Sequence, residues 1–141
     1  MKTGFALPNI GPVATAEAIA KVAQRAEALA YDSLWTIERL LWPVKPQTPY
    51  PATPDGLLPE PYKYVLDPLD TLTFAAAHTK TITLGTSVLD IPYHNPVTLG
   101  RRLTTIDFLS NGRLRVGLGL GWSKDEMDAT GGSTIRRVRQ E

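Results

Sequence analysis

Short strand-like segments alternate with helical patterns along this chain, and that alternation limits its fold more than any other feature. The strand candidates begin near residues 3, 33, 82 and 114, so the repeat is roughly 30 residues long, with about 18 extra residues in its second unit. Strands joined by helical crossovers run parallel, and the crossovers are right-handed. We therefore predict an α/β fold with a parallel sheet. The order of elements alone leaves open a doubly wound sheet or a barrel.

Capping residues and prolines mark where the helices begin. Thr15 precedes a helix whose apolar residues recur at three-and-four spacing. At Asp67 and Asn95 a capping side chain precedes a proline, which is favoured at the first helical position. Gly112 ends the third helix, and the chain reaches Glu141 in what reads as the opening of a fourth.

Proline interrupts the second unit of the repeat. Seven of the twelve prolines fall between Pro43 and Pro61, which excludes helix and most sheet from that stretch. We predict one domain over residues 1–141, with a proline-rich loop at about 41–66 that leaves the sheet where the second strand ends. So long a loop predicts a lid or a substrate wall, and an idle insertion is the alternative.

The charge balance and the rare residue types exclude several classes of function. Fifteen basic and fourteen acidic residues give a formal charge of +1, without the basic patch that nucleic-acid binding requires. Cysteine is absent and the only histidines are His78 and His94, so we expect no metal site. No apolar run of about 18 residues occurs, so we expect no membrane contact and a cytoplasmic protein.

Three glycines alternate with leucines at the end of the fourth strand candidate, which spans residues 113–121. A dinucleotide-binding fingerprint needs its third glycine three residues after the second, and Trp122 and Lys124 occupy those positions. We therefore interpret the glycines as residues that let a neighbouring helix, side-chain layer or ligand approach closely. The alternate valine and leucines form the opposite, apolar face of the strand.

Polar and aromatic residues follow the strand candidates at the end where parallel barrels assemble their active sites. Glu38 is a candidate catalytic acid or base and Arg39 a candidate ligand of a phosphate or carboxylate, with a simple Glu38–Arg39 ion pair as the alternative. The remaining candidates at these strand ends, proposed to bind a cofactor, are Asn9, Ser87, Val88, Asp90, Gly121 and Trp122.

The histidines and the other tryptophans are weaker candidates. His94, beside Asn95, is expected to be a surface loop residue, and His78 suits the negative end of a helix dipole. Trp42 in the loop and Trp122 at a strand end are placed to stack on an aromatic cofactor, although tryptophan is also an ordinary packing residue.

Four ordered blocks are spread along nearly the whole chain: Phe5-Ala-Leu-Pro-Asn9, Ala26-Glu-Ala-Leu-Ala-Tyr-Asp-Ser-Leu-Trp35, Leu84-Gly-Thr-Ser-Val-Leu89 and the run from Thr105 to Trp122. Together they resemble the luciferase-like monooxygenase superfamily, closest to its F420-dependent oxidoreductase branch. The resemblance implies a TIM barrel, of which this chain is the N-terminal half. It also implies a cofactor at the C-terminal face of the strands.

The same resemblance implies roles for individual residues. Ser87 and Val88 match the position where the family often has a non-proline cis peptide that backs the deazaflavin or flavin ring. Relatives often carry an acidic residue followed by a histidine at the positions of Glu38 and Arg39, so the arginine here departs from the family. The end of the fourth strand matches the lining of the cofactor pocket.

The implied activity is hydride transfer between coenzyme F420 and a small organic substrate. The alternatives are an FMN-dependent monooxygenase of the same superfamily and a non-catalytic assembly fragment. Relatives complete eight βα units, so a half-barrel is expected to lack much of the phosphate-tail site and to leave two parallel edges unpaired. We therefore expect a homo-oligomer that completes the barrel.

Overall fold

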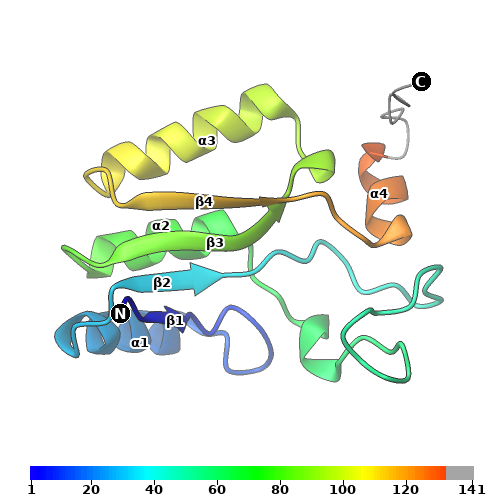
Figure 1. Cartoon of the computed structure of the whole chain (residues 1–141), viewed down its shortest axis with the longest axis horizontal. Coiled ribbons are helices and arrows are strands. Elements are labelled where there is room, and N and C mark those ends of the chain that lie inside the picture. Colours follow the sequence, from blue (N-terminus) through cyan, green and yellow to red (C-terminus); the bar gives the residue numbers. More distant parts are fainter. Residues whose placement is uncertain (133–141) are drawn as a thin grey trace.

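In the computed structural model, which describes residues 1–132, four parallel strands alternate with helices (Figure 1). Each strand pairs with the next one along the chain, in the order β1-β2-β3-β4. A doubly wound sheet would reverse its order at a switch point, so the uninterrupted order is that of a barrel wall. The elements are β1 (Gly4–Ala6), α1 (Ala16–Ala28), β2 (Ser33–Thr36), η1 (Glu60–Lys63), α2 (Pro68–His78), β3 (Thr83–Asp90), η2 (Ile91–Tyr93), α3 (Pro96–Leu109), β4 (Leu114–Gly119) and α4 (Lys124–Thr130).

The hydrophobic core lies between one face of the sheet and the helices α1, α2 and α3. Leu34, Leu84 and Leu114 stand in register on neighbouring strands, and all three are buried against these helices. Because side chains alternate along a strand, Trp35 lies on the opposite face. There a Cβ on Gly85 would collide with the Trp35 ring, so the glycine makes room for the indole.

The predicted helix starts are confirmed. The side chains of Thr15, Asp67 and Asn95 each accept a hydrogen bond from a backbone N–H in the first turn of α1, α2 and α3. Asn111 and Gly112, which follow α3, adopt positive φ angles of 57° and 76°, as the predicted left-handed helix end requires. Within residues 1–132, no helix is both long and apolar enough to cross a bilayer.

Two element boundaries differ from the sequence prediction, which gives a second strand over residues 32–38 and a fourth helix that opens near Glu141. β2 ends at Thr36, because Ile37 exchanges hydrogen bonds with the Asn9 side chain: Nδ2 donates to the Ile37 carbonyl at 2.8 Å, and the Ile37 N–H donates to Oδ1 at 3.4 Å. A side chain thus replaces the neighbouring strand as partner. The fourth helix begins at Lys124, soon after β4, and Glu141 lies outside the described residues.

The apolar face expected of the fourth strand is buried only at its start. Leu114 is buried, whereas Val116 and Leu118 are exposed. In the part of the chain that the structure describes, β4 pairs with β3 alone and is therefore an edge strand. The strand pattern identifies this apolar face, but it does not reveal whether a neighbour covers it.

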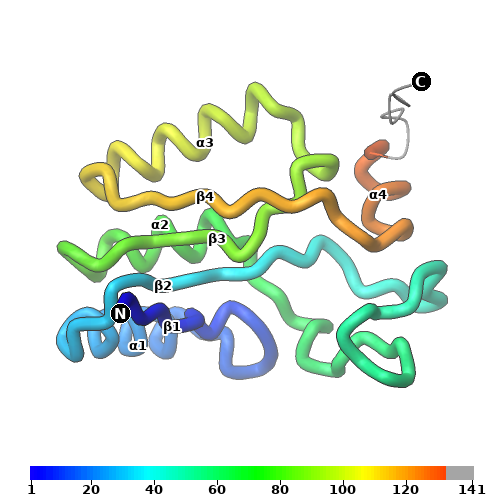
Figure 2. Tube along the Cα trace, in the orientation of Figure 1, coloured from blue at the N-terminus to red at the C-terminus, as the bar shows by residue number. Residues whose placement is uncertain are grey.

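The proline-rich connection from residue 37 to 67 lies at the C-terminal end of the strands, beside α4 (Figure 2). Asp125 of α4 accepts a hydrogen bond from the Gln47 backbone N–H at 3.0 Å, and the Lys124 N–H donates to the Thr48 hydroxyl at 3.2 Å. The rings of Tyr50 and Trp122 also pack together, with centroids 5.4 Å apart. The loop is therefore fastened over the strand ends on the side of α4.

Candidate functional site

β3 departs from regular pairing near its C-terminal end. The Ser87–Val88 peptide bond is cis, as the resemblance implied, and the register against β4 shifts between Thr86 and Leu89. The Thr86 hydroxyl fills the resulting gap, because it donates to the Gly117 carbonyl and accepts the Gly117 N–H, both at 3.0 Å. Ser87 and Val88 therefore bulge out of the ladder and are exposed, Val88 to 38%.

Gly119 at the end of β4 makes room for this bulge, and Gly121 just beyond the strand makes room for Tyr93. A Cβ on Gly119 would lie 2.5 Å from Asp90 Oδ1 and 2.5 Å from a methyl group of Val88. One on Gly121, whose φ is +70°, would lie 2.7 Å from the Tyr93 hydroxyl. The neighbours are protein atoms, so the interpretation of close approach is confirmed for these glycines.

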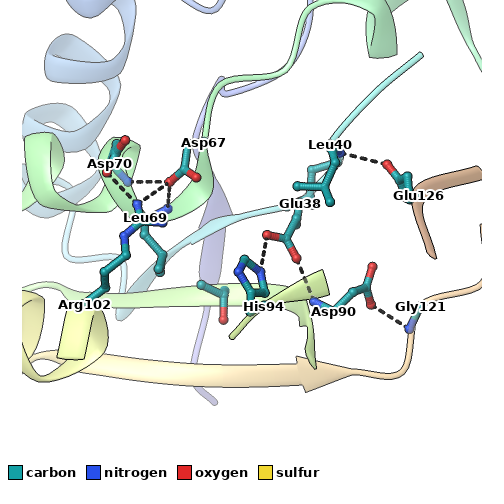
Figure 3. Close-up of polar contacts among 12 residues, drawn as sticks. Glu38, Leu40, Asp67, Leu69, Asp70, Asp90, His94, Arg102, Gly121 and Glu126 are labelled. Carbon is teal, nitrogen blue, oxygen red and sulfur yellow. Dashed lines mark hydrogen bonds and ion pairs between the residues drawn. The ribbon is translucent and has the colours of Figure 1, made fainter. Parts of the chain in front are cut away.

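Glu38 lies just beyond β2, and its carboxylate contacts Asp90 at the end of β3 and His94 before α3 (Figure 3). Its Oε2 accepts the Asp90 N–H at 2.7 Å, and its Oε1 lies 2.8 Å from His94 Nε2. The Glu38 side chain is only 1% exposed. Burial raises the pKa of Glu38, although the Asp90 N–H and the His94 ring oppose that effect.

Asp90 extends the same set of contacts to β4. Its Oδ1 accepts the Gly121 N–H at 3.0 Å, so Glu38, Asp90 and Gly121 link the ends of three neighbouring strands (Figure 3). Burial raises the pKa of Asp90, while the bond from Gly121 and the charges of Arg39 and His94 lower it. The strand ends thus carry two adjacent carboxyl groups that prefer protons more than exposed ones do.

Arg39 points toward α4 and is 5% exposed at its side chain. Its Nη2 lies 3.2 Å from Glu126 Oε1, and its guanidinium stacks 4.7 Å from the centroid of the Trp122 ring. The same Glu126 oxygen accepts the Leu40 N–H at 2.8 Å. The alternative of a Glu38–Arg39 ion pair is wrong for the described chain, because each residue pairs with a different partner.

The other predicted site residues occupy different environments. Asn9 is buried, and its amide also donates to the Leu66 carbonyl at 3.2 Å, so it ties the end of β1 to the long loop. Trp122 is partly covered by Tyr50 and Arg39. The contacts bring Glu38, Asp90 and Gly121 together, while Ser87 and Val88 stand exposed nearby; their cofactor and catalytic roles stay predictions.

Sequence reasoning missed two residues of this region. His94 was expected on the surface, and this was wrong, because its ring is 16% exposed and turned to Glu38. The sequence shows that this histidine follows a strand end, but it does not show which way the ring points. Glu126 could have been found from the sequence more easily, because it forms the Ser-x-x-Glu pattern of a capping box with Ser123, three residues earlier. The Ser123 hydroxyl accepts the Glu126 N–H at 3.4 Å, while the carboxylate turns to the β2 end instead.

Comparison with known proteins identifies the family. The sequence profile of the luciferase-like monooxygenases matches residues 2–140. The chain belongs to this family. An uncharacterized protein of Mycobacterium tuberculosis, Rv0953c, is 39% identical over 109 residues, which are 77% of this chain and 39% of that protein.

Solved structures support the same fold. The monooxygenase RslO1 of Streptomyces bottropensis is 27% identical with a TM-score of 0.70, over 93% of this chain and 36% of its own. An FMN-bound 3,6-diketocamphane monooxygenase of Pseudomonas putida is 19% identical (TM-score 0.70; 93% and 32% covered). The F420-dependent tetrahydromethanopterin reductase of Methanopyrus kandleri is 22% identical (TM-score 0.63; 92% and 30%). The chain thus spans about a third of the length of these three proteins.

Proposed function

We propose that this chain binds the ring of coenzyme F420 at the C-terminal ends of its strands, in an oxidoreductase that acts on a small organic substrate. The observation that carries the proposal is the bulge at Ser87 and Val88, which exposes an apolar side chain beside the glycines of β4. A planar ring system fits against such a surface, because no side chain from Gly119 rises next to Val88. When bound, reduced F420 supplies a hydride, which is a two-electron reduction of the substrate.

Each residue at the site would then have a separate role in binding the ring. Ser87 and Val88 would back the ring, and Gly121 and Trp122 would line its edge. Glu38 and Asp90 would hold the strand ends in place around it, through the hydrogen bonds to Asp90 and Gly121. Arg39 would act through Trp122 and α4, since its guanidinium is buried against both.

The second candidate is an FMN-dependent monooxygenase. It is supported by the match to the luciferase-like monooxygenase profile and by the 27% identity to the monooxygenase RslO1. Both cofactors present a tricyclic ring of similar shape, so the bulge at Ser87 and Val88 suits either of them. The third candidate is an assembly fragment without catalysis, which needs no cofactor.

Titration of the full chain with F420 and with FMN, followed by cofactor fluorescence and absorbance, tests the proposal. We expect saturable binding, tighter for F420, and at least about tenfold weaker for Val88→Asp, because a carboxylate under the ring would lose its hydration. Val97→Asp is the matched control, since Val97 is 80% exposed in the first turn of α3. Tighter binding of FMN would support the FMN-dependent monooxygenase. If neither cofactor binds at high micromolar concentration, the proposed cofactor site is overturned and the non-catalytic assembly fragment is supported.

A further inference from the structure

The ring of His94 fastens the connection between β3 and α3 to the end of β2. Its Nε2 lies 2.8 Å from Glu38 Oε1, and the other carboxylate oxygen accepts the Asp90 N–H at 2.7 Å. One buried carboxylate therefore holds both ends of a short segment, from Asp90 through η2 to His94 (Figure 3). This segment begins two residues after the exposed Val88, with the buried Leu89 between them.

Burying a carboxylate such as that of Glu38 costs free energy. A buried carboxylate is tolerated only with partners for both of its oxygens, and removing one partner leaves an unpaired charge. Here the partners are a backbone N–H, which cannot change its protonation, and an imidazole, which can. The strength of the connection thus depends on the protonation of one side chain.

We propose that His94 is a positioning residue: through Glu38 it sets where the Ser87–Val88 surface lies relative to the ends of β2 and β4. An imidazolium gives ionised Glu38 a charge-assisted hydrogen bond, whereas a neutral ring gives one about half as strong. Protonation of His94 therefore tightens the connection. The charged groups around it are Glu38 and Arg39 at the end of β2, Asp90 at the end of β3, and Glu126 of α4 beyond Arg39.

Nuclear magnetic resonance of the ¹⁵N-labelled full chain, without any cofactor, tests the structural part. Over a pH titration we expect the amides of Val88 and Asp90 to shift with the same midpoint as the His94 ring. In His94→Gln these shifts disappear, because a glutamine amide can replace Nε2 as donor but does not titrate. His78→Gln is the matched control, since the His78 ring contacts its own helix at the Phe74 carbonyl, and it should keep the shifts.

The part that concerns ligand affinity rests on the proposed function. Affinities are compared with those of His94→Gln at the same pH, which cancels titration of the cofactor itself. On that scale, wild type should bind F420 about threefold to tenfold more tightly below the measured midpoint of the His94 ring than above it. Binding must by linkage raise the midpoint of the His94 titration by the same factor. His94→Ala should weaken binding on both sides of that midpoint, and His94→Gln should restore the affinity that wild type has above it.

The two proposals fail separately. Val88 and Asp90 amides that do not follow the His94 titration overturn the role of His94, whatever the chain binds. Amides that follow it in a chain that binds neither F420 nor FMN support the role of His94 and overturn the proposed cofactor site. Equal F420 affinities for wild type and His94→Ala also overturn the positioning role, because a bulge set by His94 has to move when the ring is removed.

Discussion

At the scale of single residues, the bulge of β3 requires a glycine at position 119 of the neighbouring strand β4. Its missing Cβ leaves the space that the Val88 methyl group and the Asp90 carboxylate occupy. Asp90 is not free to move away, because its carboxylate accepts the Gly121 N–H and its own N–H donates to Glu38. A side chain at this position would therefore displace the bulge of β3.

Gly119→Ala should lower the free energy of unfolding by about 1 to 3 kcal/mol, as overpacking of a fixed contact does. Urea unfolding followed by circular dichroism measures the loss. Gly100→Ala is the control, because Gly100 lies inside α3 and nothing stands within 4 Å of its added Cβ; there alanine should stabilise the chain by about 0.5 to 1 kcal/mol. Equal stability of wild type and Gly119→Ala would show that the bulge adapts.

The sequence is enough to place some of these residues and not others. Because the strands of a barrel end at its active face, their order along the chain selects Glu38, Asp90 and Gly121 as neighbours. Their partners cannot be found this way: Glu38 and His94 are 56 residues apart in the sequence and meet only in the folded chain. Direction of a side chain is a tertiary property, and no local pattern carries it.

At the scale of elements, α1 is joined to the turn before β3 by one side chain. The Glu27 carboxylate accepts the backbone N–H groups of Lys80, Thr81 and Ile82, at 2.9, 2.7 and 2.9 Å. Burial alone would raise the pKa of Glu27, but these bonds outweigh it and lower the pKa from 4.5 to about 2. The folded chain thus holds this proton more weakly than the unfolded chain does.

The sign of the pH effect follows from that difference. The stability that Glu27 contributes is complete above about pH 4.5 and is lost as the pH falls toward 2. Glu27→Gln should therefore cost about 1 to 3 kcal/mol at pH 7, and the difference from wild type should shrink as the pH approaches 2. Urea unfolding across this range measures it. Glu60→Gln, which removes an exposed partner of Lys63, should change little at any pH; a Glu27→Gln deficit that persists at pH 2 would contradict the argument.

Elements are easier to predict than their contacts. Thr15, Asp67 and Asn95 act through hydrogen bonds within one turn, so local residues determine the starts of the helices. The predicted end of β2 is misplaced, because Ile37 pairs with the side chain of Asn9, which lies just beyond β1, and not with a neighbouring strand. Where an element ends on a distant side chain, propensity and pattern hold no information about it.

At the scale of the whole molecule, both outer strands of the described sheet have a free edge. β1 pairs only with β2, and β4 only with β3, among the residues that the structure describes. Apolar side chains accompany both edges. Val116, Leu118 and Leu120 are exposed along the β4 side and Phe108 is 80% exposed on α3, while an apolar groove of about 270 Å³ beside β1 is lined by Phe5, Lys21, Val22, Arg25, Ala26, Leu29 and Tyr31.

We propose that copies of this chain associate through these two edges. A two-fold axis along the barrel would place β4 of one copy beside β1 of the other twice, with all strands parallel, which closes the sheet and buries both apolar surfaces. We expect a homodimer or a larger closed oligomer by light scattering at micromolar concentration. Leu118→Lys should shift it toward the monomer, since a charge would enter the new strand pair, whereas Thr104→Lys on the exposed side of α3 should not. A wild-type monomer with the full circular dichroism of the sheet would overturn the proposal, because free parallel edges with exposed leucines would then be stable alone.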